Sequence, residues 1–454
     1  MAVALTVGCG NNYRPVVSAI NPVGPAGQPT KFAVAVSRPA PGAAGLLTFV
    51  DFSGDTVLST PSIQPDPTYF TLSNGGSFGY TINALGALDS FGASNPTSLK
   101  TSDIAQTTLL AGANPVSISP IAGSGAGTVI YIPQAGRNSI AALSSNGPSL
   151  LQELTIGANP IYVVGNDSSP RVYALSSGNG TAAGQAAAIE TTSSLPTISN
   201  TVTVGVNPIY GVMDSGNTRA YIVNKGSGTV SVINVQTNAP DLTTPTIPAT
   251  GTLGLNPTWA VYVPTLAEVL VLNSGDGVSP GSLSVISVPL CNSVTPVTNP
   301  NCNVTNPTDA TGFGTVVATV PLGVNPTMVD VLSDGSRAYV VNAGNIGANI
   351  EGSVSVVSLK SNTVTATVQG ISTAAGTADV NTNPTLVYGH PNSVSVSLAS
   401  PTGKVYITAS DNKFMTVLRT DTDAVQTHIS LQGLGLPLAT GNRPQSRGVI
   451  VTQP

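Results

Sequence analysis

The sequence carries very little charge. Only 8% of its 454 residues are charged, with 15 Lys and Arg against 20 Asp and Glu, which gives a net charge of −5. Lys and Arg nowhere form a run, whereas nucleic-acid binding requires a clustered basic face and binding to anionic membranes requires a polybasic segment. The composition therefore excludes a nucleic-acid partner, and a lipid anchor is the only membrane contact left to consider.

Long apolar runs and metal-binding side chains are also scarce. No segment reaches the roughly 18–20 apolar residues that a bilayer span requires. The only histidines are His390 and His428, which belong to different predicted strands, so a site with two histidine ligands is not expected.

Cysteine occurs three times, at Cys9, Cys291 and Cys302. The last two flank a polar, proline-rich stretch, CNSVTPVTNPNC, and we expect a disulfide that stabilises the fold by about 2–3 kcal/mol. Such a bond favours an oxidising location outside the cytoplasm, and two unpaired exposed thiols are the alternative. Cys9 follows an apolar stretch and a glycine, which resembles the end of a bacterial lipoprotein signal. It is a candidate lipidation site, although Thr6 stands where Leu is usual and no basic region precedes it.

Glycine and proline, by contrast, are abundant. The 48 Gly and 36 Pro are spread between runs rich in Val, Ile, Leu and Thr. This pattern predicts an all-β protein with many short strands and many turns.

The stretch SRAYVVNAGN at 336–345 is one copy of a repeat, because residues 219–238 match residues 337–364 almost position for position. One large apolar residue marks each of eight copies, and we expect these side chains to pack between neighbouring sheets: Phe32, Tyr80, Tyr131, Tyr173, Tyr221, Leu270, Tyr339 and Tyr406. Most are 42 to 51 residues apart, with two longer intervals of 69 and 67 residues. This period is typical of the blades of a β-propeller.

A second marker, Asn-Pro or Asp-Pro, recurs at positions 66, 114, 159, 207, 256, 325 and 383. Because proline cannot donate a hydrogen bond to a sheet, the marker should lie where the outer strand of one blade leads into the inner strand of the next. We predict four antiparallel strands between successive markers. In the repeat that begins at Pro208, the fourth strand should lie near PTIPATGTL, residues 245–253.

The first copy has no Asn-Pro strand before it. We expect the C-terminal residues Arg447, Gly448, Val449, Ile450, Val451 and Thr452 to supply that strand beside residues 31–64 and so to close the ring. Residues 13–22, YRPVVSAINP, compete for the same place. A spare strand would offer a route to self-assembly by strand addition, and a flexible tether is the alternative.

The copies resemble the YVTN-type β-propeller repeats of bacterial and archaeal cell-surface and surface-layer proteins. The resemblance covers about residues 30–454 and is sharpest at 207–255 and 325–370. Together with the eight marker copies and the two neighbouring cysteines, it predicts an all-β propeller of eight four-stranded blades, or seven as the alternative, over residues 30–454. A disulfide-closed insertion is expected around 290–314 and an N-terminal tail at 1–29. Such propellers are often labelled lactonase-like, but a fold does not determine an activity.

Few side chains are candidates for catalysis. Resemblance to lactonase-type propellers would require acidic and amide or histidine ligands at the channel, and the candidates are Asp214, Asp330, Asp334 and His390. Asp214 and Asp334 lie in turn sequences, which leaves Asp330 as the carboxylate of interest. The single tryptophan, Trp259, excludes a quinone-dependent propeller dehydrogenase. We therefore assign no catalytic and no metal-binding residue and expect no cofactor.

Asn224, Asn273 and Asn342 end the second predicted strand of three repeats. Their amides would form either a polar rim for a ligand or turns, which asparagine favours because it tolerates a left-handed backbone.

The leading interpretation is a non-enzymatic, extracytoplasmic cell-surface module with a binding or structural role. Its partners would be other cell-surface components or further copies of itself, joined by the N-terminal segment into a filament or layer. The alternative is a divergent metal-dependent hydrolase of the lactonase-like type.

Overall fold

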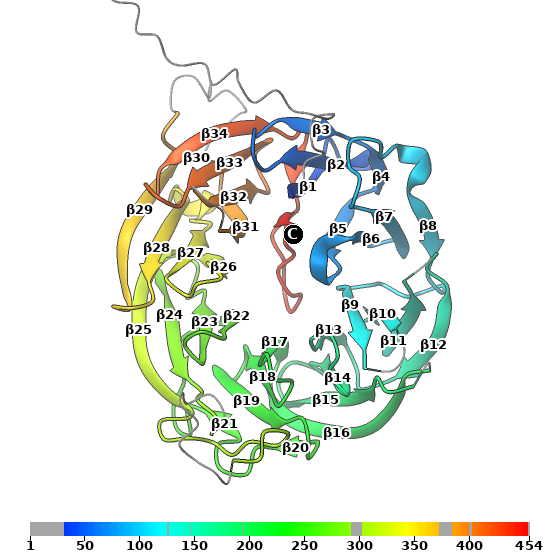
Figure 1. Cartoon of the computed structure of the whole chain (residues 1–454), viewed down its shortest axis with the longest axis vertical. Helices are drawn as coiled ribbons and strands as arrows, with labels where there is room; N and C mark the ends of the chain where they lie inside the picture. Colours follow the sequence, from blue (N-terminus) through cyan, green and yellow to red (C-terminus); the bar gives the residue numbers. More distant parts are fainter. Residues whose placement is uncertain are drawn as a thin grey trace, which may run out of the picture.

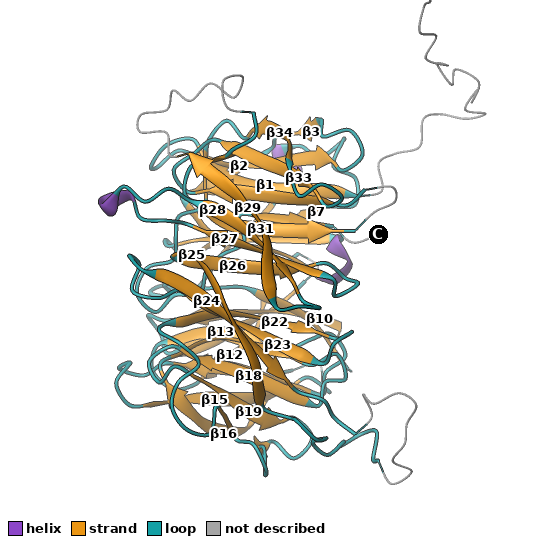
Figure 2. Ribbon diagram, turned by 90° about the vertical axis from the view of Figure 1, so that its left-hand side faces the viewer, coloured by secondary structure: helices purple, strands orange, loops and turns teal. Residues whose placement is uncertain are grey.

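The computed structural model describes residues 31–124, 127–145, 147–193, 195–291, 302–371, 384–398 and 402–452. Eight sheets follow one another around a ring (Figure 1), and each forms one blade. Seen edge-on, the ring is built of strands joined by loops, with only short helical turns (Figure 2). The prediction of an all-β propeller with eight blades is confirmed.

The blades follow the chain in order, and each runs from an inner strand near the axis to an outer strand. Blade 1 contains β1 (Phe32–Arg38), β2 (Ala44–Asp51), β3 (Val57–Ser59), β4 (Ser62–Pro65), β35 (Leu434–Gly435) and β36 (Val449–Val451). Blade 2 contains β5 (Pro67–Leu72), β6 (Phe78–Asn83), β7 (Ala87–Gly92) and β8 (Ala105–Thr108). Blade 3 contains β9 (Ser119–Gly123), β10 (Gly127–Gln134), β11 (Ser139–Ser144) and β12 (Leu150–Thr155). Blade 4 contains β13 (Pro160–Val164), β14 (Arg171–Ser176), β15 (Ala183–Glu190) and β16 (Thr197–Val206).

Blade 5 contains β17 (Pro208–Met213), β18 (Arg219–Asn224), β19 (Thr229–Asn234), β20 (Ala239–Pro240) and β21 (Thr246–Ile247). Blade 6 contains β22 (Pro257–Val263), β23 (Glu268–Asn273), β24 (Pro280–Ser287) and β25 (Thr315–Val324). Blade 7 contains β26 (Pro326–Val331), β27 (Arg337–Asn342), β28 (Ser353–Ser358), β29 (Thr363–Ile371) and β30 (Val387–Tyr388). Blade 8 contains β31 (Pro391–Ser397), β32 (Lys404–Ala409), β33 (Phe414–Arg419) and β34 (Val425–Ser430). Three short 3-10 turns lie at Asn74–Gly76, Thr101–Asp103 and Ile346–Ala348.

The C-terminus closes the ring as predicted. β36 pairs antiparallel with β1, with Val451 opposite Ala33 and Val449 opposite Ala35. β35, which was not predicted, extends the same edge of β1. An ion pair between Lys404 of blade 8 and Asp55 of blade 1 is a second link between the last and the first blade of the ring. The N-terminal tail, the rival segment 13–22 and Cys9 lie outside the described residues.

The core lies between the blades. Each of the eight marker side chains lies on the second strand of its blade and is at most 4% exposed. In three blades the marker tyrosine also reaches the next blade through its hydroxyl group: Tyr173 donates to Asn238, Tyr339 to Asp423, and Tyr406 to Asp55. Neighbouring blades are therefore joined both by apolar packing and by buried polar contacts.

Two expectations about strands and turns were wrong. The fourth strand of blade 5 is not continuous over 245–253 but consists of two two-residue strands, β20 and β21. Pro240, Pro245 and Pro248 interrupt it, because proline has no amide hydrogen for the sheet.

The three asparagines that end second strands form neither a rim nor turns. Asn224, Asn273 and Asn342 are at most 1% exposed. The amide nitrogen of Asn342 donates to the hydroxyl groups of Ser353 and Ser355, at 3.0 and 2.9 Å. Gly323 of the preceding blade lies against the same amide, and a Cβ there would lie 2.7 Å from Cγ of Asn342. The glycine before the Asn-Pro marker is thus required by packing between blades.

The predicted disulfide is present between Cys291 and Cys302, whose Cα atoms are 5.7 Å apart. A few residues beyond Cys302, Asp309 contacts Arg219 of blade 5 at 3.2 Å. This described part of the insertion, after Cys302, therefore rests against the neighbouring blade.

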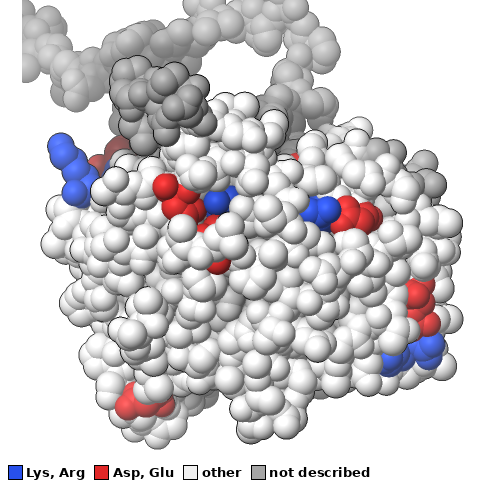
Figure 3. Space-filling view, turned by 90° about the horizontal axis from the view of Figure 1, so that it is seen from below, with Lys and Arg blue, Asp and Glu red and all other residues white. Residues whose placement is uncertain are grey.

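Charged atoms are sparse on the side of the ring shown in Figure 3, and several blue atoms lie next to red ones. Among the described residues, every arginine except Arg443 forms an ion pair with a carboxylate.

Candidate ligand-binding site in the channel

Nearly every inner strand begins with a β-bulge. In blade 4, Pro160 pairs with Ser176 and Tyr162 pairs with Leu175, so Ile161 is an extra residue. The same irregularity follows the first proline of β5, β17, β22, β26 and β31. A bulge redirects side chains, and here it brings the residue two positions after the proline to the axis.

Large aromatic side chains occupy that position in four blades: Tyr69, Tyr162, Tyr210 and Trp259. The ring centroids of Tyr162 and Tyr210 are 4.6 Å apart, and those of Tyr210 and Trp259 are stacked at 4.2 Å. Burial raises the pKa of Tyr210 well above its ordinary value, so its hydroxyl group stays protonated. Blades 4, 5 and 6 thus present a continuous aromatic wall to the channel.

Residues 436–447, which we call the plug segment, extend into the middle of the ring and return to β36 (Figure 1). They enter from the end where the Asn-Pro markers lie. Asn442 accepts a hydrogen bond of 2.9 Å from Asn207, and Arg443 donates one of 2.9 Å to Asn114. The plug segment occupies this end of the channel, so the site lies toward the opposite end, where the inner strands finish.

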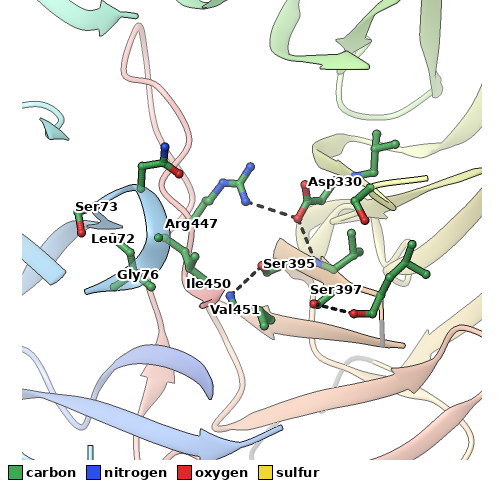
Figure 4. A pocket seen from close by; sticks show the side chains of 15 residues that line it. Leu72, Ser73, Gly76, Asp330, Ser395, Ser397, Arg447, Ile450 and Val451 are labelled. Atoms are coloured by element: carbon green, nitrogen blue, oxygen red, sulfur yellow. Dashed lines mark hydrogen bonds and ion pairs between the residues drawn. The ribbon is translucent and has the colours of Figure 1, made fainter. Parts of the chain in front are cut away.

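Arg447, at the end of the plug segment, faces the aromatic wall. Its guanidinium carbon lies 5.6 Å from the ring centroid of Trp259. Its Nη1 atom is 3.5 Å from Oδ2 of Asp330 (Figure 4), which is a weak contact. Within the described residues Asp330 is its only hydrogen-bonding partner. Burial opposes the charge, but the Asp330 carboxylate favours it, and the net effect raises the pKa of Arg447.

Asp330 is held by the backbone rather than by Arg447. Its Oδ2 atom accepts a hydrogen bond of 2.9 Å from the amide of Val396, and its Oδ1 atom accepts one of 3.2 Å from the amide of Val331. Its side chain is 16% exposed, whereas that of Arg447 is 28% exposed. The guanidinium therefore keeps donors that the protein does not satisfy.

Arg447 lines three adjoining cavities of about 600, 240 and 160 Å³. The largest lies against Tyr162 and Tyr210 and also contacts Asn166, Asp167 and Tyr262. The second contains Asp330 and Ser395 (Figure 4). A concave space bordered by aromatic side chains and convergent polar groups is a candidate small-molecule site.

The other predicted carboxylates do not join this site. Asp214 is buried and accepts hydrogen bonds from the amides of Thr218 and Arg219, and Asp334 accepts from Ser336. His390, just before β31, bonds through Nδ1 to Asp411 at 2.6 Å. No three His, Cys, Asp or Glu side chains gather as ligands for a metal ion in the part of the chain that the structure describes.

The plug segment was not predicted from the sequence. Arg447 was predicted only as part of the closing strand, and its place beside the aromatic side chains was not foreseen. The aromatic wall was not predicted either. One signal was present: four of the seven marker prolines are followed two positions later by Tyr or Trp.

Comparison with known proteins supports the fold alone. No family model matches the chain, and no curated protein matches it either. Among solved structures, it is similar to the dihydro-heme d1 dehydrogenase NirN in complex with DHE, at 10% identity and a TM-score of 0.58, over 92% of this chain and 77% of that one. Kuenenia stuttgartiensis hydrazine synthase is 13% identical over 71% of this chain and 92% of its own, with a TM-score of 0.49. A putative 6-phosphogluconolactonase of Bacteroides fragilis NCTC 9343 is 14% identical over 75% of this chain and 95% of its own, also with a TM-score of 0.49. At such identities the shared feature is the β-propeller, not an activity.

Proposed function

We propose that this propeller is a non-enzymatic, extracytoplasmic binding module of the YVTN type, and that it binds a small organic anion at Arg447. The aromatic wall supplies apolar contact for the body of the ligand, and the guanidinium supplies a planar donor edge for a carboxylate. The partly buried carboxylates of Asp330 and Asp167 at the margins of the site disfavour dianions by repulsion.

The observation that carries the proposal is the contrast between two arginines of equal exposure. Arg337 is 29% exposed, and its Nη1 atom lies 2.7 Å from both carboxylate oxygens of Asp423. Arg447 is 28% exposed, and within the described residues its side chain makes one polar contact, of 3.5 Å, with Asp330. The first arginine is used by the fold, whereas the second retains its hydrogen-bonding capacity for a ligand.

The extracytoplasmic location in this proposal is supported by the disulfide, because such bonds persist in oxidising compartments. Cell-surface attachment through Cys9 and self-assembly through residues 1–29 remain predictions.

The proposal can be tested with a single fluorescent reporter, because Trp259 is the only tryptophan and lies beside Arg447. Titration with a panel of aliphatic and aromatic monocarboxylates should change the Trp259 emission with saturation. Arg447→Met should weaken the response of the best ligand at least tenfold, because a charge-assisted hydrogen bond contributes about 1.5–3 kcal/mol. Lys360→Met, at an exposed position, is the control and should leave it unchanged.

The proposal fails if no member of the panel gives a saturable response, or if Arg447→Met responds like the control. Hydrolysis of lactones that requires Asp330 would favour the lactonase-like alternative instead.

A further inference from the structure

A separate cavity of about 170 Å³ lies at the other end of the channel, between the plug segment and blades 5 to 7. Two of its lining residues are cations, Lys225 and Arg443, and none is acidic. The adjoining cavity on the far side of Arg443 also has no acidic lining residue. In a chain with a net charge of −5, two cations without a carboxylate in one hollow call for an explanation.

Neither cation has its charge neutralised within the described residues. Lys225 donates through Nζ to the carbonyl oxygen of Gly441 at 3.1 Å, and Arg443 donates to the side-chain oxygen of Asn114 at 2.9 Å. Both partners are neutral. Burial lowers the pKa of Lys225, which is the behaviour of an ammonium group that loses water without gaining a counter-ion.

The β-bulges add polar groups to this cavity. The extra residues of the bulges in blades 6 and 7, Thr258 and Thr327, line this cavity. The hydroxyl of Thr327 already donates to backbone carbonyl oxygens. The hydroxyl oxygen of Thr258 is buried and makes no hydrogen bond in the described residues. An unpaired buried hydroxyl costs about 1–3 kcal/mol, and an acceptor bound in this cavity would relieve that cost.

We propose that this cavity is an anion site that takes one small oxyanion group, a phosphate or a carboxylate. Lys225 supplies a point charge, Arg443 a planar pair of donors, and Thr258 a hydroxyl donor. The site is distinct from the one at Arg447, lies on the opposite side of the plug segment, and does not depend on the function proposed above.

The test uses the whole protein carrying Arg447→Met, which removes the channel site proposed above, and inorganic phosphate or acetate as probes. Each salt is titrated at constant ionic strength, with chloride as the balancing anion, while the thermal unfolding midpoint is recorded. We expect a saturable rise in the midpoint that chloride does not reproduce. Lys225→Met and Arg443→Gln should each weaken the apparent affinity at least tenfold, and Thr258→Val at least threefold. Lys360→Met and Arg419→Gln, at exposed positions, are the matched controls.

If only phosphate raises the unfolding midpoint, the cavity takes a phosphoryl group. If acetate raises it as well, the cavity also accepts a carboxylate. Both outcomes support the proposal. It is overturned if neither probe raises the midpoint beyond chloride, or if the three variants respond like the controls. Thr258→Val keeps the test decisive even if a change at Arg443 disturbs the plug segment, because Thr258 belongs to the rigid inner strand β22.

Discussion

Replacing Asp55 by Asn removes one charge from the joint between blade 8 and blade 1. Asp55 has a left-handed backbone conformation, with φ of 54°, which Asn adopts readily, so the change leaves the turn intact. Its Oδ2 atom lies 2.8 Å from Nζ of Lys404, and that ammonium group also donates to the carbonyl of Phe52 at 2.6 Å. The side chains of Asp55 and Lys404 are each only 8% exposed.

The expected cost follows from this burial. Asp55→Asn leaves a buried ammonium group with no opposite charge, and breaking such a pair costs about 3–5 kcal/mol of unfolding free energy. The double variant Asp55→Asn/Lys404→Met removes both charges and should recover most of that loss. The control is the surface pair of Arg419 and Asp421, whose side chains are 45% and 41% exposed. Asp421→Asn should lower the unfolding free energy by only about 0–1 kcal/mol.

Urea unfolding followed by far-ultraviolet circular dichroism measures these differences. The reasoning is refuted if Asp55→Asn costs no more than Asp421→Asn, because the ion pair would then contribute nothing to ring closure. It is also refuted if the double variant is less stable than Asp55→Asn alone.

Three further predictions concern the blades. Asn342→Ala should lower the unfolding free energy by about 2–3 kcal/mol, because it leaves Ser353 and Ser355 without their shared donor. Gly323→Ala should lower it less in the Asn342→Ala background than in the native protein, because the new Cβ would no longer meet the amide. If a double-mutant cycle measured in urea gives additive losses, the packing of Gly323 against Asn342 is contradicted. Burial raises the pKa of Tyr80 to about 12 from its ordinary 10, so the folded state keeps a proton that the unfolded state releases. The unfolding free energy that depends on protonated Tyr80 is fully present below pH 10 and is lost between pH 10 and about pH 12, at about 1.4 kcal/mol per pH unit. When the native protein and Tyr80→Phe are unfolded in urea at pH 9 to 11, the variant should lack this contribution to the decline of stability with pH. Changing Cys291 and Cys302 together to Ser should cost about 2–3 kcal/mol, as should reduction of the native protein, and a loss below about 1 kcal/mol in either measurement would contradict the stabilising role of the bond.

The ring could be predicted because its signal is repeated. The marker aromatics and the Asn-Pro turns recur in nearly every blade, and the missing inner strand of the first copy pointed to Val449–Val451. The interruption of the fourth strand of blade 5 was also readable from its prolines, although the prediction gave them too little weight.

The plug segment could not be predicted in the same way. Residues 436–447 do not follow the repeat, and their partners, Asn114 and Asn207, are more than two hundred residues away in the chain. The position of Arg447 beside Trp259 depends on that placement and on a β-bulge that rotates the inner strand. Only the aromatic residues after the marker prolines could have indicated where a ligand binds.

The most direct test of the central claim compares the unfolding free energies of Arg447→Met and Arg337→Met, together with the Trp259 response to the best carboxylate ligand. Loss of the close contacts of Arg337 to Asp423 should cost at least about 2 kcal/mol and leave the ligand response intact. Arg447→Met should cost less than about 1 kcal/mol, or stabilise the fold, while it abolishes the response, because this side chain serves a ligand at the expense of stability. If Arg447→Met destabilises the protein as strongly as Arg337→Met and the ligand response persists, Arg447 is a structural residue and the channel site is elsewhere.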